Sequence, residues 1–232
     1  MTTVFDRIVI AVPDLPEASE QYQAMFGSEP LQCISATGVP AAWWGLPNTV
    51  IELVQHEIEA PRIVGIVLSA PNAESGELPV ANSLGLDIRL GTGRHTADFR
   101  RARPELQYSR LKVDHLVLRT DNADACIELF SGQLGIRLAL DKTAPEWGGR
   151  MLFFRTGKLT LEVIESDSDE PSGNFFWGIA YQCQKLDSVA GELRGRGVAL
   201  SDIRSGRKPG TRVTTVKSHC LEIPTLLIET AK

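Results

Sequence analysis

The sequence predicts an α+β protein of four βαβββ units, paired into two curved-sheet, barrel-like halves. The main observation is an internal repeat, in which a shift of 108 residues places residues 6–10 on residues 114–118 without a gap. A second match, with a slip of two residues, places residues 50–53 on residues 160–163. Self-similarity of this kind is typical of folds built from copies of one supersecondary unit.

The first unit is expected to be a strand, a helix and three further strands. Residues 6–12 are apolar and β-branched, as in a buried strand. Asp14 is placed to cap the helix, and Gly27 to end it in a left-handed conformation. Short strands should follow at residues 31–37, 40–46 and 49–55.

The third unit repeats this order over residues 112–165. A strand at 113–119 leads to a cap at Asp121-Asn122 and to a helix that Gly135 ends. Strands are then expected at residues 136–141, 150–155 and 159–165.

The second and fourth units are related by a shift of 113 residues, which places Gly65 on Gly178. The second unit is degenerate, since the segment from Thr96 to Gln107 is polar and has no clear strand. Its expected elements are a strand at 63–68, a helix at 73–84 and a strand at 86–90. The fourth unit should have a strand at 177–183, a helix at 186–195 and strands that run to residue 229.

These units predict two similar halves, an N-terminal half at residues 1–110 and a C-terminal half at residues 111–232. The acidic stretch at residues 165–171 is expected to be a solvated linker between the third and fourth units.

Composition excludes several classes of protein. The chain of 232 residues is 43% hydrophobic and 23% charged, an ordinary globular balance. A net charge of −5 argues against a nucleic-acid partner. No apolar run approaches the ~18 residues of a membrane span, and no secretory signal is visible, so a cytoplasmic location is expected. The four cysteines form no CxxC pair.

Common cofactor and catalytic motifs are missing. The sequence contains no GxxxxGK[ST], no GxGxxG after a strand, no HExxH and no GxSxG. Nucleotide-binding, dinucleotide-binding, zincin and α/β-hydrolase functions therefore have no support.

Four stretches resemble one known superfamily: DRIVIAVPDLPEASEQY, VDHLVLRTDNADACIELF, LTLEVIE and KPGTRVTTV with IPTLLIE. They are similar to the vicinal oxygen chelate superfamily, which includes glyoxalases, bleomycin-resistance proteins and extradiol dioxygenases. The resemblance implies paired βαβββ units whose curved sheets close around a cup. In members with a metal, it implies ligands from the first strand (commonly His) and the last strand (commonly Glu) of each unit.

Taken unit by unit, these implied positions hold Arg7 and Glu52, then Gly65, then His115 and Glu162, then Gly178 and Glu229. The resemblance thus implies one divalent metal ion in the C-terminal half, with His115, Glu162 and Glu229 as ligands. Iron, manganese, zinc, nickel and cobalt all remain open, as does a protein without metal. An iron site with two His and one Glu would need a second His where Gly178 stands, which argues against ring cleavage.

Such an ion would leave positions for two neighbouring oxygens of a substrate and would stabilise the enolate or oxyanion that forms. A carboxylate would move the proton, and Glu229 is the catalytic candidate. Tyr181 is a second candidate, as a proton donor, although packing within the sheet is the preferred explanation for it. His115 has a structural alternative too, as a histidine hydrogen-bonded to a loop.

The N-terminal half is not expected to hold a metal. Arg7 takes the place of the ligand and should pair with Glu52 across the sheet. The alternative is that Arg7 holds an anionic group of a substrate.

Aromatic residues suggest the kind of ligand. They either belong to the core or form the wall of a pocket for a flat, apolar molecule. The candidates are Trp43-Trp44, Trp147 and Phe175-Phe176-Trp177.

The leading interpretation is a small-molecule metalloenzyme with a lyase, isomerase or dioxygenase reaction. The alternative is a metal-free protein that binds or sequesters an apolar or aromatic small molecule. A scaffold that forms a homodimer through its strand edges is a third interpretation.

Overall fold

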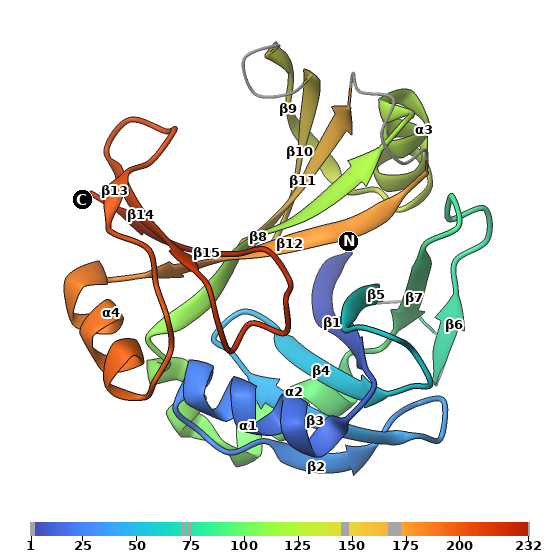
Figure 1. The fold of residues 1–232 in the computed structure, drawn as a ribbon. Coiled ribbons are helices and arrows are strands. Elements are labelled where there is room, and N and C mark those ends of the chain that lie inside the picture. The colour runs from blue at the N-terminus through green and yellow to red at the C-terminus, as the bar shows by residue number, and fades with distance from the viewer. Residues whose placement is uncertain (1–2, 71–72, 74–75, 145–148, 167–172, 232) are drawn as a thin grey trace.

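The computed structural model describes residues 3–231 except 71–72, 74–75, 145–148 and 167–172. Two mixed sheets, sheet A with seven strands and sheet B with eight, form the two halves (Figure 1). This confirms the predicted α+β fold of paired, curved sheets. Trp147 and residues 167–171 of the expected linker lie outside the described residues.

The first unit has the predicted order. Asp14 caps the helix by accepting the backbone N–H of Glu17 at 2.9 Å, and Gly27 ends it with φ of 69°. The elements are β1 (Val4–Val12), α1 (Leu15–Phe26), β2 (Leu31–Ile34), β3 (Pro40–Gly45) and β4 (Val50–Gln55).

The second unit departs from the prediction. The helix expected at residues 73–84 is wrong, because Gly76 has φ of 105° and Pro79 lies in a short strand, so neither suits a helix interior. The helix of this unit instead follows its last strand. The elements are β5 (Arg62–Ser69), β6 (Glu77–Pro79), β7 (Asp87–Gly91), α2 (Arg94–Ala102) and a short 3-10 helix, η1 (Pro104–Tyr108).

The third unit follows the prediction, with one change in its helix. Asn122 accepts the backbone N–H of Ala125 at 2.9 Å, and Gly135 has φ of 65°. Between these residues the α-helix widens into a π-helix, in which the N–H of Leu134 reaches the carbonyl of Leu129 at 3.0 Å. The elements are β8 (Leu111–Thr120), α3 (Ala123–Ile127), η2 (Glu128–Gln133), β9 (Arg137–Ala144), β10 (Gly149–Thr156) and β11 (Leu159–Ser166).

The fourth unit has its helix where the sequence predicts it. Leu186, Val189 and Leu193 of this helix are buried against sheet B. The elements are β12 (Phe175–Cys183), α4 (Leu186–Gly195), β13 (Arg204–Ser205), β14 (Thr211–Val216) and β15 (Thr225–Thr230).

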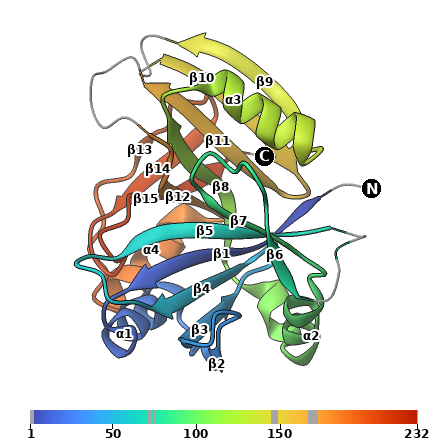
Figure 2. The ribbon, with the colours of Figure 1, turned by 90° about the vertical axis from the view of Figure 1, so that its right-hand side faces the viewer.

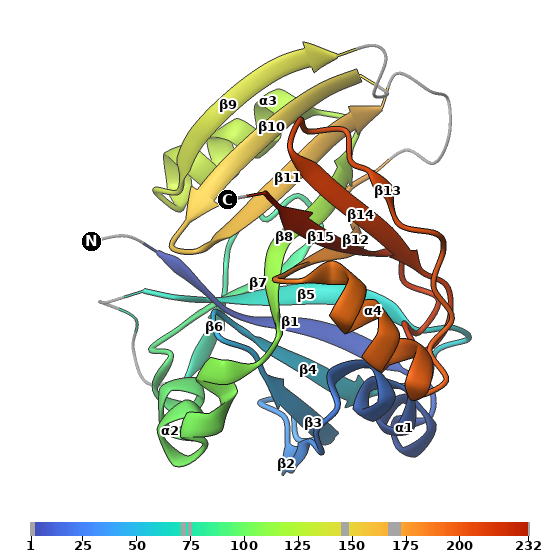
Figure 3. The same cartoon turned by 90° about the vertical axis from the view of Figure 1, so that its left-hand side faces the viewer.

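Both sheets share one plan. The order is β2-β3-β4-β1-β5-β7-β6 in sheet A and β13-β14-β15-β12-β8-β11-β10-β9 in sheet B. The first strands of two units lie antiparallel at the centre, and each is parallel to the last strand of its own unit. Sheet B curls so that β13–β14 and β9–β10 rise on either side of β8 and β12 (Figure 1). Helix α3 covers one face of β9–β11, in front of them in Figure 2 and behind them in Figure 3.

One large apolar core joins the helix-covered faces of both sheets. Ile8 and Ile10 of β1 and Leu116 and Leu118 of β8 are completely buried in it. Because side chains alternate along a strand, the residues between them face away from this core. Both sheets therefore keep a second face on which polar side chains are gathered.

Hydrogen bonds across the halves fix their relative position. Thr3 donates to the carbonyl of Leu134 at 3.0 Å. Asn48 donates to the carbonyl of Val113 at 2.7 Å and accepts its N–H at 3.1 Å. Among the described residues, none of the helices has the length and apolar character needed to cross a membrane.

Candidate functional site

His115 and Glu162 meet on the face of sheet B that points away from the core. In the parallel pairing of β8 with β11, His115 lies beside Thr160. Glu162 is two residues further along β11, and because side chains alternate along a strand, His115 and Glu162 share this face. Nε2 of His115 lies 3.5 Å from Oε2 of Glu162. The two side chains are 18% and 15% exposed, so a small molecule in solvent can reach the pair.

A β-bulge brings Asp114 to the same site. In the pairing of β8 with β12, Val113 lies opposite Tyr181 and His115 opposite Ala180, so Asp114 is the extra residue. Its Oδ2 lies 2.9 Å from Nδ1 of His115. A carboxylate on Nδ1 fixes the imidazole ring and leaves Nε2 directed to Glu162.

The pKa values of both His115 and Glu162 are raised, so both side chains bind protons more readily than usual. Burial opposes protonation of His115, but the hydrogen bond with Asp114 and the negative charges of Glu162 and Asp114 outweigh it, so the pKa of His115 is raised. Burial raises the pKa of Glu162, against the opposing positive charges of His115 and Arg207. The hydrogen bond with His115 lowers the pKa of Asp114. Proton binding is thus favoured both on the imidazole of His115 and on the carboxylate of Glu162.

The position of a second histidine cannot hold a side chain. A Cβ atom added to Gly178 would lie 2.6 Å from the carbonyl oxygen of Pro224. Gly65 has the same restriction in sheet A, where the carbonyl of Asp87 lies too close. The backbone of the neighbouring strand therefore excludes a His at Gly178, which supports the expectation that a two-His iron site cannot form there.

The structure does not bring Glu229 to His115. One Glu229 oxygen accepts the N–H of Leu186 at 3.2 Å, at the start of α4, and the other lies 3.1 Å from Nη1 of Arg212. In the part of the chain that the structure describes, no three His, Cys, Asp or Glu side chains are grouped as ligands of one ion. Of the three ligands expected from the sequence, the structure brings only His115 and Glu162 close together.

Tyr181 lies in the apolar core and is 1% exposed. Its ring packs edge-on against Phe26, at 5.7 Å between centroids. Burial raises the pKa of Tyr181 well above its ordinary value. Of the two interpretations given for Tyr181, its position fits packing and not proton donation at His115.

In the N-terminal half, Arg7 occupies the place of His115, and its predicted ion pair with Glu52 is confirmed. Nε of Arg7 lies 2.9 Å from Oε2 of Glu52. The guanidinium also contacts Asp6 at 3.2 Å, and it contacts Glu77 of β6. The side chains of Arg7 and Glu52 are 3% and 4% exposed. Three carboxylates around one guanidinium disfavour the alternative in which Arg7 holds an anion.

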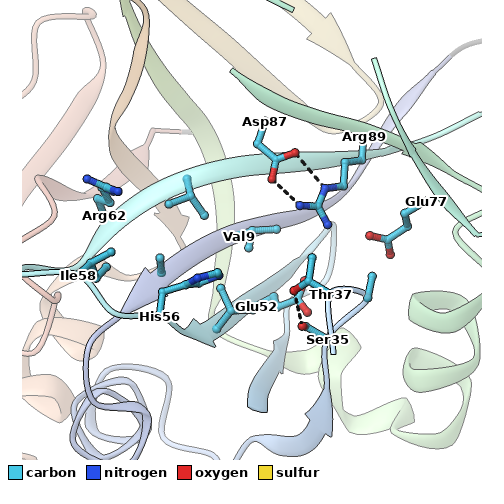
Figure 4. A pocket seen from close by; sticks show the side chains of 14 residues that line it. Val9, Ser35, Thr37, Glu52, His56, Ile58, Arg62, Glu77, Asp87 and Arg89 are labelled. Atoms are coloured by element: carbon cyan, nitrogen blue, oxygen red, sulfur yellow. Dashed lines mark hydrogen bonds and ion pairs between the residues drawn. The ribbon is translucent and has the colours of Figure 1, made fainter. Parts of the chain in front are cut away.

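Two cavities lie beside this ion network. The smaller, of about 230 Å³, contains Glu52, Glu77 and His56 above apolar side chains of the sheet. Figure 4 shows Asp87 and Arg89 facing one another across its edge, joined by two hydrogen bonds of 2.9 and 2.7 Å. The larger cavity, of about 590 Å³, shares Glu77 and is lined by side chains that include Asp6, Arg7, Trp43 and Phe99.

Sequence reasoning missed two members of the network. The repeat contains a signal for Asp6, which aligns with Asp114 and is likewise the extra residue of a bulge, between Phe5 and Arg7. Glu77 has no such signal, since it falls in the segment expected to be a helix.

A family model described as "Glyoxalase/Bleomycin resistance protein/Dioxygenase superfamily" matches residues 114–215, a little under half of the chain. A mutant of 4-hydroxymandelate synthase from Streptomyces coelicolor has the same fold, with a TM-score of 0.74 and 14% identity. The similarity covers 98% of this chain and 92% of that one. A methylmalonyl-CoA epimerase from Mycobacterium tuberculosis is 20% identical over 52% of this chain and 88% of its own, with a TM-score of 0.42. No curated protein sequence matches this chain.

Proposed function

We propose that this chain, whose residues 114–215 belong to the glyoxalase, bleomycin-resistance and dioxygenase superfamily, is a small-molecule enzyme that works on the free face of sheet B. The observation that carries the proposal is the approach of His115 Nε2 to Glu162 Oε2 at 3.5 Å, with Asp114 behind the imidazole. Ionisable groups with shifted pKa values, gathered on a face outside the core, are typical of sites where protons or metal ions are handled.

His115 and Glu162 fit one side of a divalent metal ion. Ligand atoms that each lie about 2.1 Å from one ion are separated by roughly 3 Å or slightly more, and the observed 3.5 Å is close to that. The other positions would be left for water and for two neighbouring oxygens of a substrate. Glu229 would have to leave Arg212 and α4 to join, so the proposed set has two protein ligands. Iron, manganese, zinc, nickel and cobalt all accept an imidazole and a carboxylate.

When bound, such an ion would stabilise negative charge that develops on the substrate oxygens. The residues of the chain would do the remaining work. Glu162, the carboxylate nearest the imidazole, would take a proton from the substrate and return it, and Asp114 would hold the imidazole in place. Lyase and isomerase steps need this proton movement, whereas Gly178 argues against a two-His oxygenase.

Elemental analysis of freshly purified, untagged protein tests the proposal. About one divalent ion per chain is expected, and both His115→Ala and Glu162→Gln should lose it. His56→Ala is the matched control, because His56 lies in the other half, and it should keep the ion. Protein without metal, or a His115→Ala variant that still binds it, would rule out the metalloenzyme.

A metal-free binding protein is the second candidate, and the apolar side chains around the pair favour it. Val117, Met151 and Ile164 form a small cluster with Phe153 on the same face. Trp177, the extra residue of a bulge in β12, is 44% exposed. Under this function, a screen of aromatic compounds without added metal should raise the melting temperature, and no compound should be turned over.

A further inference from the structure

We infer that the N-terminal half contains a second ligand site, in the cavity of about 590 Å³, for a small organic cation with an amine on an apolar or aromatic body. The site lies in sheet A and does not depend on the function proposed for sheet B.

The cavity has the size and walls of a small-molecule site. Its volume falls in the range of about 300–1,000 Å³ that is usual for such sites. Trp43 and Phe99 form an aromatic wall, with rings packed edge-to-face at 5.8 Å. Leu31 and Ile34 of the edge strand β2 also line it and are 42% and 66% exposed. An apolar body would bury these side chains, which now face solvent.

A buried donor at this wall has no partner. Nε1 of Trp43 is buried and finds no acceptor among the residues that the structure describes. Arg7 lies over the ring of the same side chain, 4.8 Å from its centroid. Because a buried N–H without an acceptor is unfavourable, a water oxygen would stabilise this arrangement, and the N–H would report any ligand that enters beside the ring.

The charges beside the cavity favour a cation. Asp6 and Glu77 line it, and both contact Arg7 together with Glu52. One guanidinium balances only one of these three carboxylates. An ammonium group placed at Asp6 and Glu77 would offset the remaining negative charge, whereas a carboxylate ligand would add to it.

Other cations nearby do not remove this excess. Arg89 is paired with Asp87 through both of its carboxylate oxygens. Arg100 acts on Asp6 through its charge and so offsets a second of the three carboxylates, which leaves one negative charge unbalanced. Arg103 also lines the cavity, and it is paired with Glu105. Arg94 also lines the cavity, but its side chain is exposed, so solvent weakens its effect.

The geometry points to an organic cation and not to a metal ion. Among the described residues, no three acidic, His or Cys side chains are arranged so that they could hold one metal ion. An ammonium group needs only two carboxylates as acceptors. Its apolar body would gain the contacts with Trp43 and Phe99 that a metal ion could not make.

Three probes of the same shape test the inference on the wild-type chain: phenethylamine, 2-phenylethanol and 3-phenylpropionate. The readouts are titration calorimetry and the indole N–H resonance of Trp43, assigned by its loss in Trp43→Phe. Phenethylamine should shift this resonance and bind at least about tenfold more tightly than 3-phenylpropionate. Equal or tighter binding of the acid, or an amine that leaves the resonance unmoved, would overturn the inference.

Single substitutions then test whether the carboxylate of Glu77 binds the ammonium group of the ligand. Glu77→Gln should weaken phenethylamine binding about tenfold, while Glu59→Gln, a change at an exposed carboxylate of the same half, should have no effect. His115→Ala should also leave amine binding unchanged, which separates this site from the one in sheet B. A folded Glu77→Gln protein with unchanged affinity would contradict the inference. If that variant does not fold, the comparison of amine with acid on the wild-type chain still decides.

Discussion

In the N-terminal half the repeated first-strand position is Arg7, and in the C-terminal half it is His115, while the carboxylates beside them, Glu52 and Glu162, are equivalent. The Arg7 side chain is 3% exposed and contacts three carboxylates. The His115 side chain is 18% exposed, and its two ring nitrogens lie near the carboxylates of Asp114 and Glu162. The long side chain of Arg7 reaches all three carboxylates and joins them in one structural ion network. The shorter side chain of His115 leaves the carboxylate of Glu162 accessible to a ligand. The length of one side chain thus separates a stabilising centre from a candidate reactive one.

The largest expected effect comes from breaking the network at its centre. Arg7→Met should lower the free energy of unfolding by about 3–5 kcal/mol, because it leaves Asp6, Glu52 and Glu77 buried without their common cation. His115→Ala should lower it by only about 1 kcal/mol, since the partners of His115 remain in reach of water. Urea unfolding of the two variants measures the contrast.

Equal losses in the two variants would refute the contrast between a structural and a reactive half. A triple variant, Arg7→Met with Glu52→Leu and Glu77→Leu, serves as the control. It should recover part of the lost stability, because it no longer buries those two charges.

A smaller loss of stability is expected from removing Asn48, a residue of the N-terminal half that hydrogen-bonds the strand carrying His115. Asn48 bonds both backbone groups of Val113, two residues before His115, and also donates to the carbonyl of Lys158 at 3.2 Å. Asn48→Ala should cost about 1–2 kcal/mol of stability and should shift the titration of His115, followed by its NMR resonances.

Asn174→Ala is the matched control for that experiment. Asn174 also crosses between the halves, donating to the carbonyl of Leu84 at 3.1 Å, but it contacts β8 at Thr120, far along the strand from His115. It should lower stability without moving the titration. If both variants move it equally, Asn48 has no specific role in positioning the histidine strand.

The smallest effect is the pH dependence that His115 contributes to the stability of the C-terminal half. Because the folded pKa of His115 lies above its ordinary value of 6.5, its contribution to stability is complete below that value. The contribution is lost as the pH rises through the folded pKa. The stability difference between wild type and His115→Ala should therefore shrink from pH ~5 to pH ~9.

Metal uptake should show the opposite trend, since the ion must displace the proton on Nε2. Equilibrium dialysis over the same pH range measures it. A difference in stability that grows with pH would show that His115 is neutral in the folded protein.

The repeat and the turn chemistry predict most of the fold from sequence. Asp14, Gly27 and Gly135 mark helix ends because their roles are local and follow from backbone conformation alone. The helix α2 is missed because only Thr96 and Phe99 of it are buried, so its apolar pattern is too sparse to recognise. Gly76 and Pro79 argue against the helix expected at 73–84, and the sequence prediction gave them too little weight.

The candidate site is predicted only where it follows the repeat. The approach of His115 to Glu162 follows from their equivalent places on neighbouring strands. The engagement of Glu229 with Arg212 and of Glu77 with Arg7 depends on side-chain reach between strands that are distant in sequence. No periodicity in the chain records such contacts, so they require the three-dimensional structure.

The carbonyl of Pro224 also restricts which residues can replace Gly178 during the evolution of the C-terminal half. A mutation of Gly178 to His would introduce a side chain that clashes with this carbonyl oxygen. The loop that ends at Pro224 contains three non-glycine residues with positive φ, His219, Leu221 and Glu222. A variant with a second histidine, at position 178, would need a different conformation of that loop first. The present backbone therefore opposes the evolution of a two-histidine site in this half.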